Sequence, residues 1–204
     1  MGTRDFKLRA KDNLRGQWPL LVVITLLVLF VTGAGANNLR FESEQGTNVS
    51  LNLITFLLNG PINLGMALLY LGLEQTKTAR LESFLEGFRS FLDAFLLNLL
   101  TMAFVILWSL LLVVPGIIAA IRYSMAYLIM AEDPGMTPRK ALDASKALMA
   151  GHKAEYALFV LSFIGWGILT IITFGLASLY LIPYFNASKV NFYHAIKGEP
   201  SHRA

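Results

Sequence analysis

The sequence has 204 residues, of which 55% are apolar and only 15% are charged. Soluble domains contain about 25% charged residues, so this composition argues against a water-soluble globular protein. The absence of cysteine excludes disulfides, thiolate metal sites and a cysteine nucleophile. The net charge of +4 comes from basic clusters outside the apolar runs, which indicate membrane topology rather than binding to nucleic acid.

Long runs without Asp, Glu, Lys or Arg divide the chain. A transmembrane helix needs about 20 mostly apolar residues. The runs therefore predict an all-α, polytopic membrane helical bundle, formed by one integral-membrane domain over residues 1–204. The six expected transmembrane helices are residues 18–36, 51–73, 94–114, 116–131, 156–174 and 176–193.

The first apolar run also resembles a secretory signal, because a basic start precedes it and the small residues Ala34 and Ala36 offer a cleavage site. We expect the run to be retained as a transmembrane helix. Its removal would leave an odd number of crossings and would separate the two termini across the membrane.

The stretch NGPIN, residues 59–63, interrupts the second apolar run. Irregular backbone at membrane depth survives only inside protein or beside a wet cavity, so a re-entrant break is one interpretation. We prefer the alternative that the helix starts near Pro61, with residues 51–59 at the interface, because proline is tolerated at helix starts.

The third apolar run carries a Pro-Gly pair where one helix would be too long. The 38 residues from 94 to 131 would extend about 57 Å, nearly twice the hydrocarbon core of about 30 Å. Pro115 disfavours helical geometry at Val114, and Gly116 allows a sharp reversal. The stretch VVPG is therefore predicted to be a tight hairpin turn at the outer membrane face.

Arg122 lies six residues beyond this turn, at a depth of about 9 Å. An arginine in this position usually snorkels to the nearby surface or pairs with backbone carbonyls. The functional alternative is that Arg122 binds an anion or a lipid headgroup, because the start of a helix also favours negative charge.

Three tyrosines spaced by 57 residues, Tyr70, Tyr127 and Tyr184, indicate an internal repeat. We predict three pseudo-repeated hairpins, each preceded by a cytoplasmic interfacial amphipathic helix. The last of these helices is expected to begin at Pro138, with Thr137 as its N-cap. Its expected apolar face consists of Leu142, Ser145, Leu148 and Met149. The units and a flexible tail are expected at about residues 4–76, 77–135, 136–197 and 198–204.

The basic residues indicate how the chain is threaded. Fifteen of the 17 fall on one side of the six expected helices, whereas Arg40 falls opposite and Arg122 lies inside. By the positive-inside rule, both termini are expected to be cytoplasmic, in a cell membrane. An expected interfacial cuff, which docks acidic lipid or anchors the bundle, consists of Arg15, Arg89, Arg139, Lys140, Lys146 and Lys153.

Two stretches carry a family resemblance: LWSLLLVVPGIIAAIRYSMAYLIMAEDP from residue 107, and LIPYFNASKVNFYHAIKG from residue 181. Over about residues 84–197 the sequence resembles the uncharacterised bacterial integral-membrane family called domain of unknown function 975. The resemblance implies a multi-pass bacterial membrane protein. It supplies no activity, substrate or catalytic residue.

The sequence shows no constellation typical of catalysis, so we expect neither an enzyme nor a cofactor or metal site. The expected position at the cytoplasmic face or tail applies to His152, His194 and His202. None of them shares a helical turn with two further metal ligands. Glu132 and Asp133 are expected to be solvated. A polar pathway would be lined by Asn63, Asn98 and Ser124. The alternative is that these side chains form hydrogen bonds between helices.

The functional expectation is a multi-pass membrane protein without enzymatic activity that acts at its cytoplasmic face. Its expected partners are membrane lipids, and further candidates are other membrane or cytoplasmic proteins, with no nucleic acid. The alternatives are a small transporter or channel, with Arg122 near an outward-facing anion-binding pocket, and a lipid-acting enzyme. The oligomeric state does not follow from the sequence.

Overall fold

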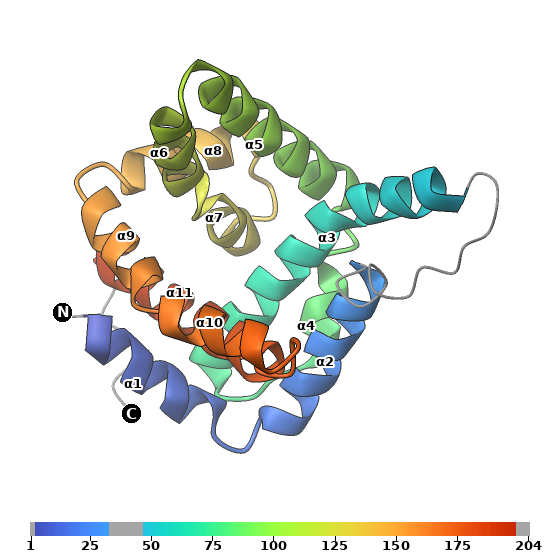
Figure 1. The fold of residues 1–204 in the computed structure, drawn as a ribbon, viewed down its shortest axis with the longest axis vertical. Coiled ribbons are helices and arrows are strands. Elements are labelled where there is room, and N and C mark those ends of the chain that lie inside the picture. The colour runs from blue at the N-terminus through green and yellow to red at the C-terminus, as the bar shows by residue number, and fades with distance from the viewer. Residues whose placement is uncertain (1–2, 33–46, 199–204) are drawn as a thin grey trace.

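The computed structural model describes residues 3–32 and 47–198, apart from the side chains of residues 47–54 and Leu111. Within these ranges all regular structure is helical (Figure 1), which confirms the all-α prediction. The helices are α1 (Thr3–Leu14), α2 (Trp18–Val31), α3 (Thr47–Thr76), α4 (Leu81–Glu86), α5 (Phe91–Leu111), α6 (Val113–Tyr123), α7 (Ala126–Glu132), α8 (Pro138–Leu148), α9 (Lys153–Leu161), α10 (Ile164–Ile172) and α11 (Ser178–Lys197).

Four helical segments of the described chain are long and apolar enough to cross a membrane: Thr55–Thr76, Phe91–Leu110, Val113–Glu132 and Lys153–Ile172. They correspond to four of the six expected crossings. The first expected crossing contains α2, which has 14 residues and follows α1 across a bend of 103°. Fourteen residues extend about 21 Å, less than the hydrocarbon core. The last expected crossing falls on α11, so the six-helix arrangement stays a prediction.

The chain reverses between α5 and α6, but earlier than the Pro-Gly pair predicts. α5 ends at Leu111 and α6 begins at Val113, so the turn is Leu112, whose backbone is extended (φ −165°, ψ 148°). Pro115 lies in the first turn of α6. Backbone N–H groups there have no partner within the helix, so the N–H that proline lacks costs no hydrogen bond. Gly116 serves the packing of the two helices instead, because a Cβ there would collide with Ser109.

α3 runs through Pro61 without a break. Both interpretations of NGPIN are therefore wrong, since this stretch is neither re-entrant nor the start of a helix. Proline is tolerated inside membrane helices where neighbouring segments pack closely. The packing is close here, because a Cβ on Gly60 would collide with the Ala94 carbonyl and a Cβ on Gly65 with the Phe84 carbonyl.

Burial distinguishes a central helix from peripheral ones. Within Thr55–Thr76, 61% of the most apolar 18-residue stretch is buried. The corresponding share is only 17% in Phe91–Leu110 and in Lys153–Ile172. The outer helices expose large apolar side chains along their length, among them Leu96, Ile106, Leu158 and Ile171. An apolar surface of this extent is stable against lipid and not against water. The structure is therefore consistent with a membrane protein.

The three short amphipathic helices pack on the bundle: α1 on α11, α4 on α3, and α8 on α5 and α7. Of the predicted apolar face, Leu142 and Ser145 of α8 and its C-cap residue Met149 are buried as expected, and Leu148 is half-buried. The bundle covers these faces, so lipid does not. What α8 presents outward is mainly its polar and charged side chains.

An aromatic stack fastens three helices at the start of α11. The Tyr180 ring lies between the rings of Trp18 on α2 and Trp166 on α10, with centroids 4.7 Å and 5.1 Å away. Such pairs contribute about 0.5–1.5 kcal/mol each beyond the area they bury. This stack holds the start of α2 against α11, and so positions the first apolar helix.

Candidate functional site

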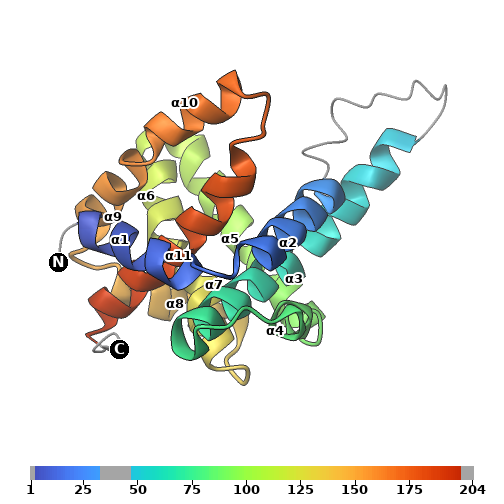
Figure 2. The ribbon, with the colours of Figure 1, turned by 90° about the horizontal axis from the view of Figure 1, so that it is seen from below.

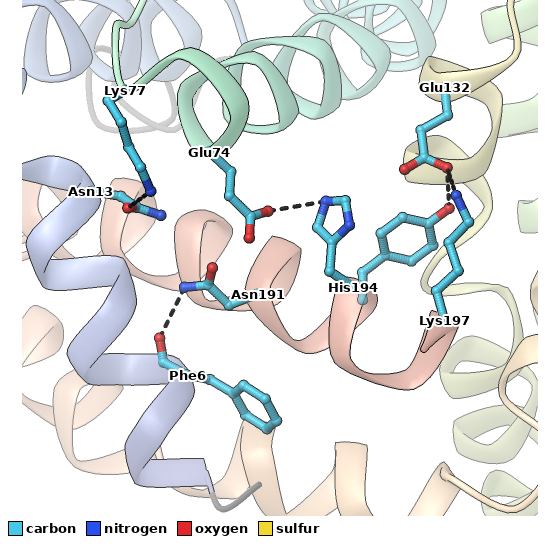
Figure 3. A network of polar contacts seen from close by, with 9 residues as sticks. Phe6, Asn13, Glu74, Lys77, Glu132, Asn191, His194 and Lys197 are labelled. Atoms are coloured by element: carbon cyan, nitrogen blue, oxygen red, sulfur yellow. Dashed lines mark hydrogen bonds and ion pairs between the residues drawn. The ribbon is translucent and has the colours of Figure 1, made fainter. Parts of the chain in front are cut away.

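A cluster of paired polar side chains lies at the end of the bundle where α3, α7 and α11 terminate. We call this the charged end. Figure 2 shows α4, α8 and the last turn of α11 on this lower side, and the turn between α10 and α11 on the upper side. Side chains from α1, α3, α7 and α11 meet there (Figure 3).

Glu74 and His194 form the most enclosed charged contact of the charged end (Figure 3). Glu74 Oε2 lies 3.0 Å from His194 Nε2, and the side chains are 12% and 10% exposed, respectively. With so little water nearby, the carboxylate strongly attracts a protonated imidazole. Loss of either partner would leave the other group buried. The contact therefore fixes the last turn of α3 to the last turn of α11.

Glu132, the last residue of α7, holds the same part of α11. Its Oε2 accepts hydrogen bonds from Tyr193 Oη at 2.6 Å and from Lys197 Nζ at 2.7 Å. Bonds to a charged carboxylate are roughly twice as strong as bonds between neutral groups. Since Tyr193 is 1% exposed, its hydroxyl has little access to water. Glu132 thus gives α11 a second attachment, to α7.

α1 is attached to the charged end by backbone and side-chain contacts. The Asn191 amide donates to the Phe6 carbonyl at 3.1 Å, and Lys77 Nζ donates to Asn13 Oδ1 at 2.7 Å. Asn191 is 3% exposed, so its amide bond to α1 is protected from competing water. These contacts place the N-terminal helix beside the ends of α3 and α11.

The chemistry of the charged end is the pairing of largely enclosed carboxylates with basic and hydroxyl groups, since the Glu74 side chain is 12% exposed and that of Glu132 is 21% exposed. Among the described residues no three His, Asp or Glu side chains are grouped as a metal site would require. Both carboxylates instead face α11, which supplies His194, Tyr193 and Lys197 as partners. The geometry is suited to joining helices.

One sequence expectation about this cluster is wrong, and one residue was missed. Glu132 is bonded to α11 instead of being solvated with Asp133, while His194 is buried at 8% exposure. Glu74 was not singled out, although a lone acid at the end of an apolar run is a signal for a paired carboxylate. His152 pairs with Glu155 at 3.3 Å near the surface, and His202 lies outside the described residues.

The site at Arg122 near the outer face stays a prediction, but Arg122 lies farther from the hairpin turn than expected. It is the tenth residue of Val113–Glu132, about 15 Å from the turn instead of about 9 Å. The reason is that the turn falls at Leu112. The side chain is half-buried, and no ion pair or hydrogen bond joins it to another described residue.

Ser145 of α8 completes the backbone at the break between α6 and α7. Its hydroxyl donates to the Arg122 carbonyl at 2.7 Å and accepts from the Met125 N–H at 3.2 Å. Ser145 is fully buried, so the two backbone groups have no access to water there. A helix that looked like a surface element therefore supports the middle of a candidate membrane span.

Replacing Ser145 by alanine is expected to lower the free energy of unfolding by about 2 kcal/mol, because it leaves the buried Met125 N–H without an acceptor. Thermal and denaturant unfolding in detergent would measure the loss. Ser188→Ala is a matched control, since Ser188 is equally buried but donates to Tyr184 O within its own helix. Equal losses in the two variants would contradict a bridging role for Ser145.

The predicted polar pathway is only partly assembled. Asn63 Nδ2 donates to Asn59 Oδ1 at 3.0 Å, and Asn98 Oδ1 accepts from Asn59 at 3.4 Å and from Tyr127 at 3.2 Å. Asn63 and Asn98 therefore belong to one chain of hydrogen bonds across α3, α5 and α7. Ser124 is not part of this chain, because its hydroxyl donates to the Ile121 carbonyl.

The expected basic cuff lies on the amphipathic segments. Five of its six side chains are exposed and Lys153 is half-buried. Arg89 follows α4, three members lie on α8, Lys153 begins α9, and Arg15 lies between α1 and α2. The exposed members are Arg15, Arg89, Arg139, Lys140 and Lys146.

Comparison with known proteins gives a family and no named relative. The family model described as "Protein of unknown function (DUF975)" matches residues 1–121 and 109–200. No curated protein and no solved structure matches the chain. Together the two matches extend over nearly the whole sequence, so the chain belongs to this family of proteins of unknown function, DUF975.

Proposed function

We propose that this protein is a non-enzymatic, multi-pass protein of a bacterial cell membrane that binds anionic lipid headgroups at its charged end. The observation that carries the proposal is the outward face of α8, where Arg139, Lys140 and Lys146 are exposed. The apolar face of the same helix is already covered by the bundle. What remains for an outside partner is positive charge, which anionic headgroups complement. Acidic membrane or cytoplasmic proteins are the second class of partner.

The packing supports a three-unit arrangement with both termini on the cytoplasmic side. α4 packs on α3, α8 packs on α5 and α7, and α1 packs on α11. In each case an amphipathic helix rests on the preceding unit, with the first unit closing on the third. Lys7 adds to this closure, because its Nζ donates to Ser162 O at 2.8 Å, at the break between α9 and α10. Such cyclic packing fits three hairpins in one bundle.

Neutralising the cuff on α8 is expected to weaken binding of phosphatidylglycerol at least tenfold. The variant carries Arg139→Gln, Lys140→Gln and Lys146→Gln, and each basic residue near an anionic surface contributes about 1 kcal/mol. Nanodiscs with increasing phosphatidylglycerol in phosphatidylcholine, read by a fluorescent lipid, would measure the affinity.

The matched control for this variant keeps the charge and changes the side chains: Arg139→Lys, Lys140→Arg and Lys146→Arg. It is expected to bind as the unchanged protein does, and binding should weaken with salt in both. Identical affinity in the neutralised variant, with an unchanged unfolding temperature, would refute the proposed lipid binding by α8.

A transporter or channel is the second candidate, and the amide chain of α3 and α5 favours it. Asn59 and Asn63 are exposed although they lie within a candidate membrane span. Exposed amides in a membrane segment are costly unless water or another polar group reaches them. Solute flux into proteoliposomes containing the purified protein would identify this function, and flux absent across a broad solute panel would count against it.

A further inference from the structure

The charged face of α8 sets how far Arg122 lies from the lipid headgroups. Ser145 on one face of α8 bonds the Arg122 carbonyl, while Asp143 and Lys146 on its outer side are exposed. A helix with its side chains is about 10–12 Å wide. Charged side chains remain in water or among headgroups. The backbone of Arg122 therefore lies within about 10 Å of the headgroup region, although it is in the middle of an apolar segment.

Arg122 carries a charge for which the surrounding helices supply no counterion. α6 packs against α5, α8 and α9, whose acids are Asp93, Asp143 and Glu155. None of the three forms an ion pair with Arg122 within the described structure, and Glu155 contacts His152. The next acid along the chain, Glu132, is ten residues away and accepts from Tyr193 and Lys197. An arginine remains charged in a protein, so this charge needs a partner other than the acids of the described residues.

The position of Arg122 on α6 makes it reachable from the lipid. Ile118, one turn earlier, is 37% exposed, whereas Ala119 beside it is 2% exposed. On the helix surface, Arg122 lies between the exposed side that carries Ile118 and the buried side that carries Ala119. It is thus at the edge where the lipid-facing surface of α6 meets its buried surface. The hydroxyl of Ser124, two residues further along the chain, donates to Ile121 O and not to Arg122. The guanidinium donors are thus available on the lipid side.

We propose that Arg122 binds the phosphate of one anionic phospholipid from the leaflet next to α8. A guanidinium presents a planar fork that matches two phosphate oxygens and binds them with paired, charge-assisted hydrogen bonds. A lipid phosphate supplies the missing counterion, and its acyl chains would lie along the exposed apolar strip of Val114, Ile117 and Ile118. The site rests on the proposed lipid binding and adds one defined position to it.

Native mass spectrometry of the purified chain with phosphatidylglycerol would test the site. Exposed contacts of the cuff are screened at 1 M salt, where the Debye length is about 3 Å, whereas half-buried contacts are screened less. We expect the unchanged protein to retain one phosphatidylglycerol at high salt. Arg122→Gln should lose it, with at least a tenfold drop in occupancy, and Arg122→Lys should retain it more weakly.

Three outcomes would overturn the site: an unchanged protein that retains no lipid at high salt, an Arg122→Gln variant that retains it equally, or equal retention of phosphatidylcholine. The first needs no variant, so the proposal stays testable if Arg122→Gln does not fold. Displacement of the lipid by millimolar inorganic phosphate would also overturn it, in favour of a soluble anion. The α8 cuff variant should lose the salt-sensitive lipids and keep the salt-resistant one, so the two proposals fail separately.

Discussion

Replacing Gly65 by alanine is expected to lower the free energy of unfolding by about 3 kcal/mol. A Cβ at this position would collide with the Phe84 carbonyl, and a Cβ on Gly87 would lie 2.8 Å from the Pro61 carbonyl and even closer to the Gly65 backbone. Backbone atoms cannot move aside as a flexible side chain can. α3 and the segment that links α4 to α5 would have to separate, and α3 is the most buried of the candidate membrane spans.

Thermal unfolding in detergent, followed by tryptophan fluorescence, would measure this loss. Gly167→Ala is the matched control, since Gly167 also lies within a helix but a Cβ there meets no described atom within 4 Å. The control is expected to leave stability unchanged or to raise it by up to about 1 kcal/mol, because alanine has the higher helix propensity. A Gly65→Ala protein as stable as the Gly167→Ala protein would contradict the close backbone packing.

Separating Glu74 from His194 is expected to have the second largest effect, about 3 kcal/mol for either Glu74→Gln or His194→Gln. Each substitution leaves a partner that is at least 88% buried without its charged contact. The double variant should lose less than the sum of the single losses by at least about 1 kcal/mol, because both substitutions remove the same interaction. Denaturant unfolding of all four proteins at one pH would give this coupling energy.

The pair Asp12 and Arg15 provides the control for the coupling. These side chains are 3.6 Å apart but 67% and 76% exposed, respectively, and exposed pairs contribute at most about 1 kcal/mol. Their double-variant cycle should show a coupling close to zero. A Glu74–His194 coupling equally close to zero would show that the two groups do not interact in the folded protein.

Local patterns in the sequence predicted local features well. The spacing of Leu142, Ser145 and Met149 identified the face of α8 that is buried, because a helical period depends only on neighbouring residues. The chain reversal before Pro115 was predicted as well, although three residues too late. Proline is equally compatible with the residue after a turn and with the first turn of a helix, so the sequence could not place the turn more closely.

The glycines were harder to interpret because glycine allows both a bend and a close approach. Gly60 suggested a break in the second apolar run, but it lies inside a continuous α3 and faces the Ala94 carbonyl. The opposite case is Gly165 and Gly167, which lie inside a helix but where a Cβ would meet no described atom within 4 Å. Which glycine is crowded depends on the helix opposite.

The sequence by itself determined that this chain is helical, apolar enough for a membrane and basic at one set of loops, because these properties depend on composition and on short-range spacing. The tertiary structure alone decided that Glu74 contacts His194 and that Ser145 supports the backbone at Arg122. Those partners lie far apart in the chain. Their meeting depends on how whole helices pack, which no local pattern records.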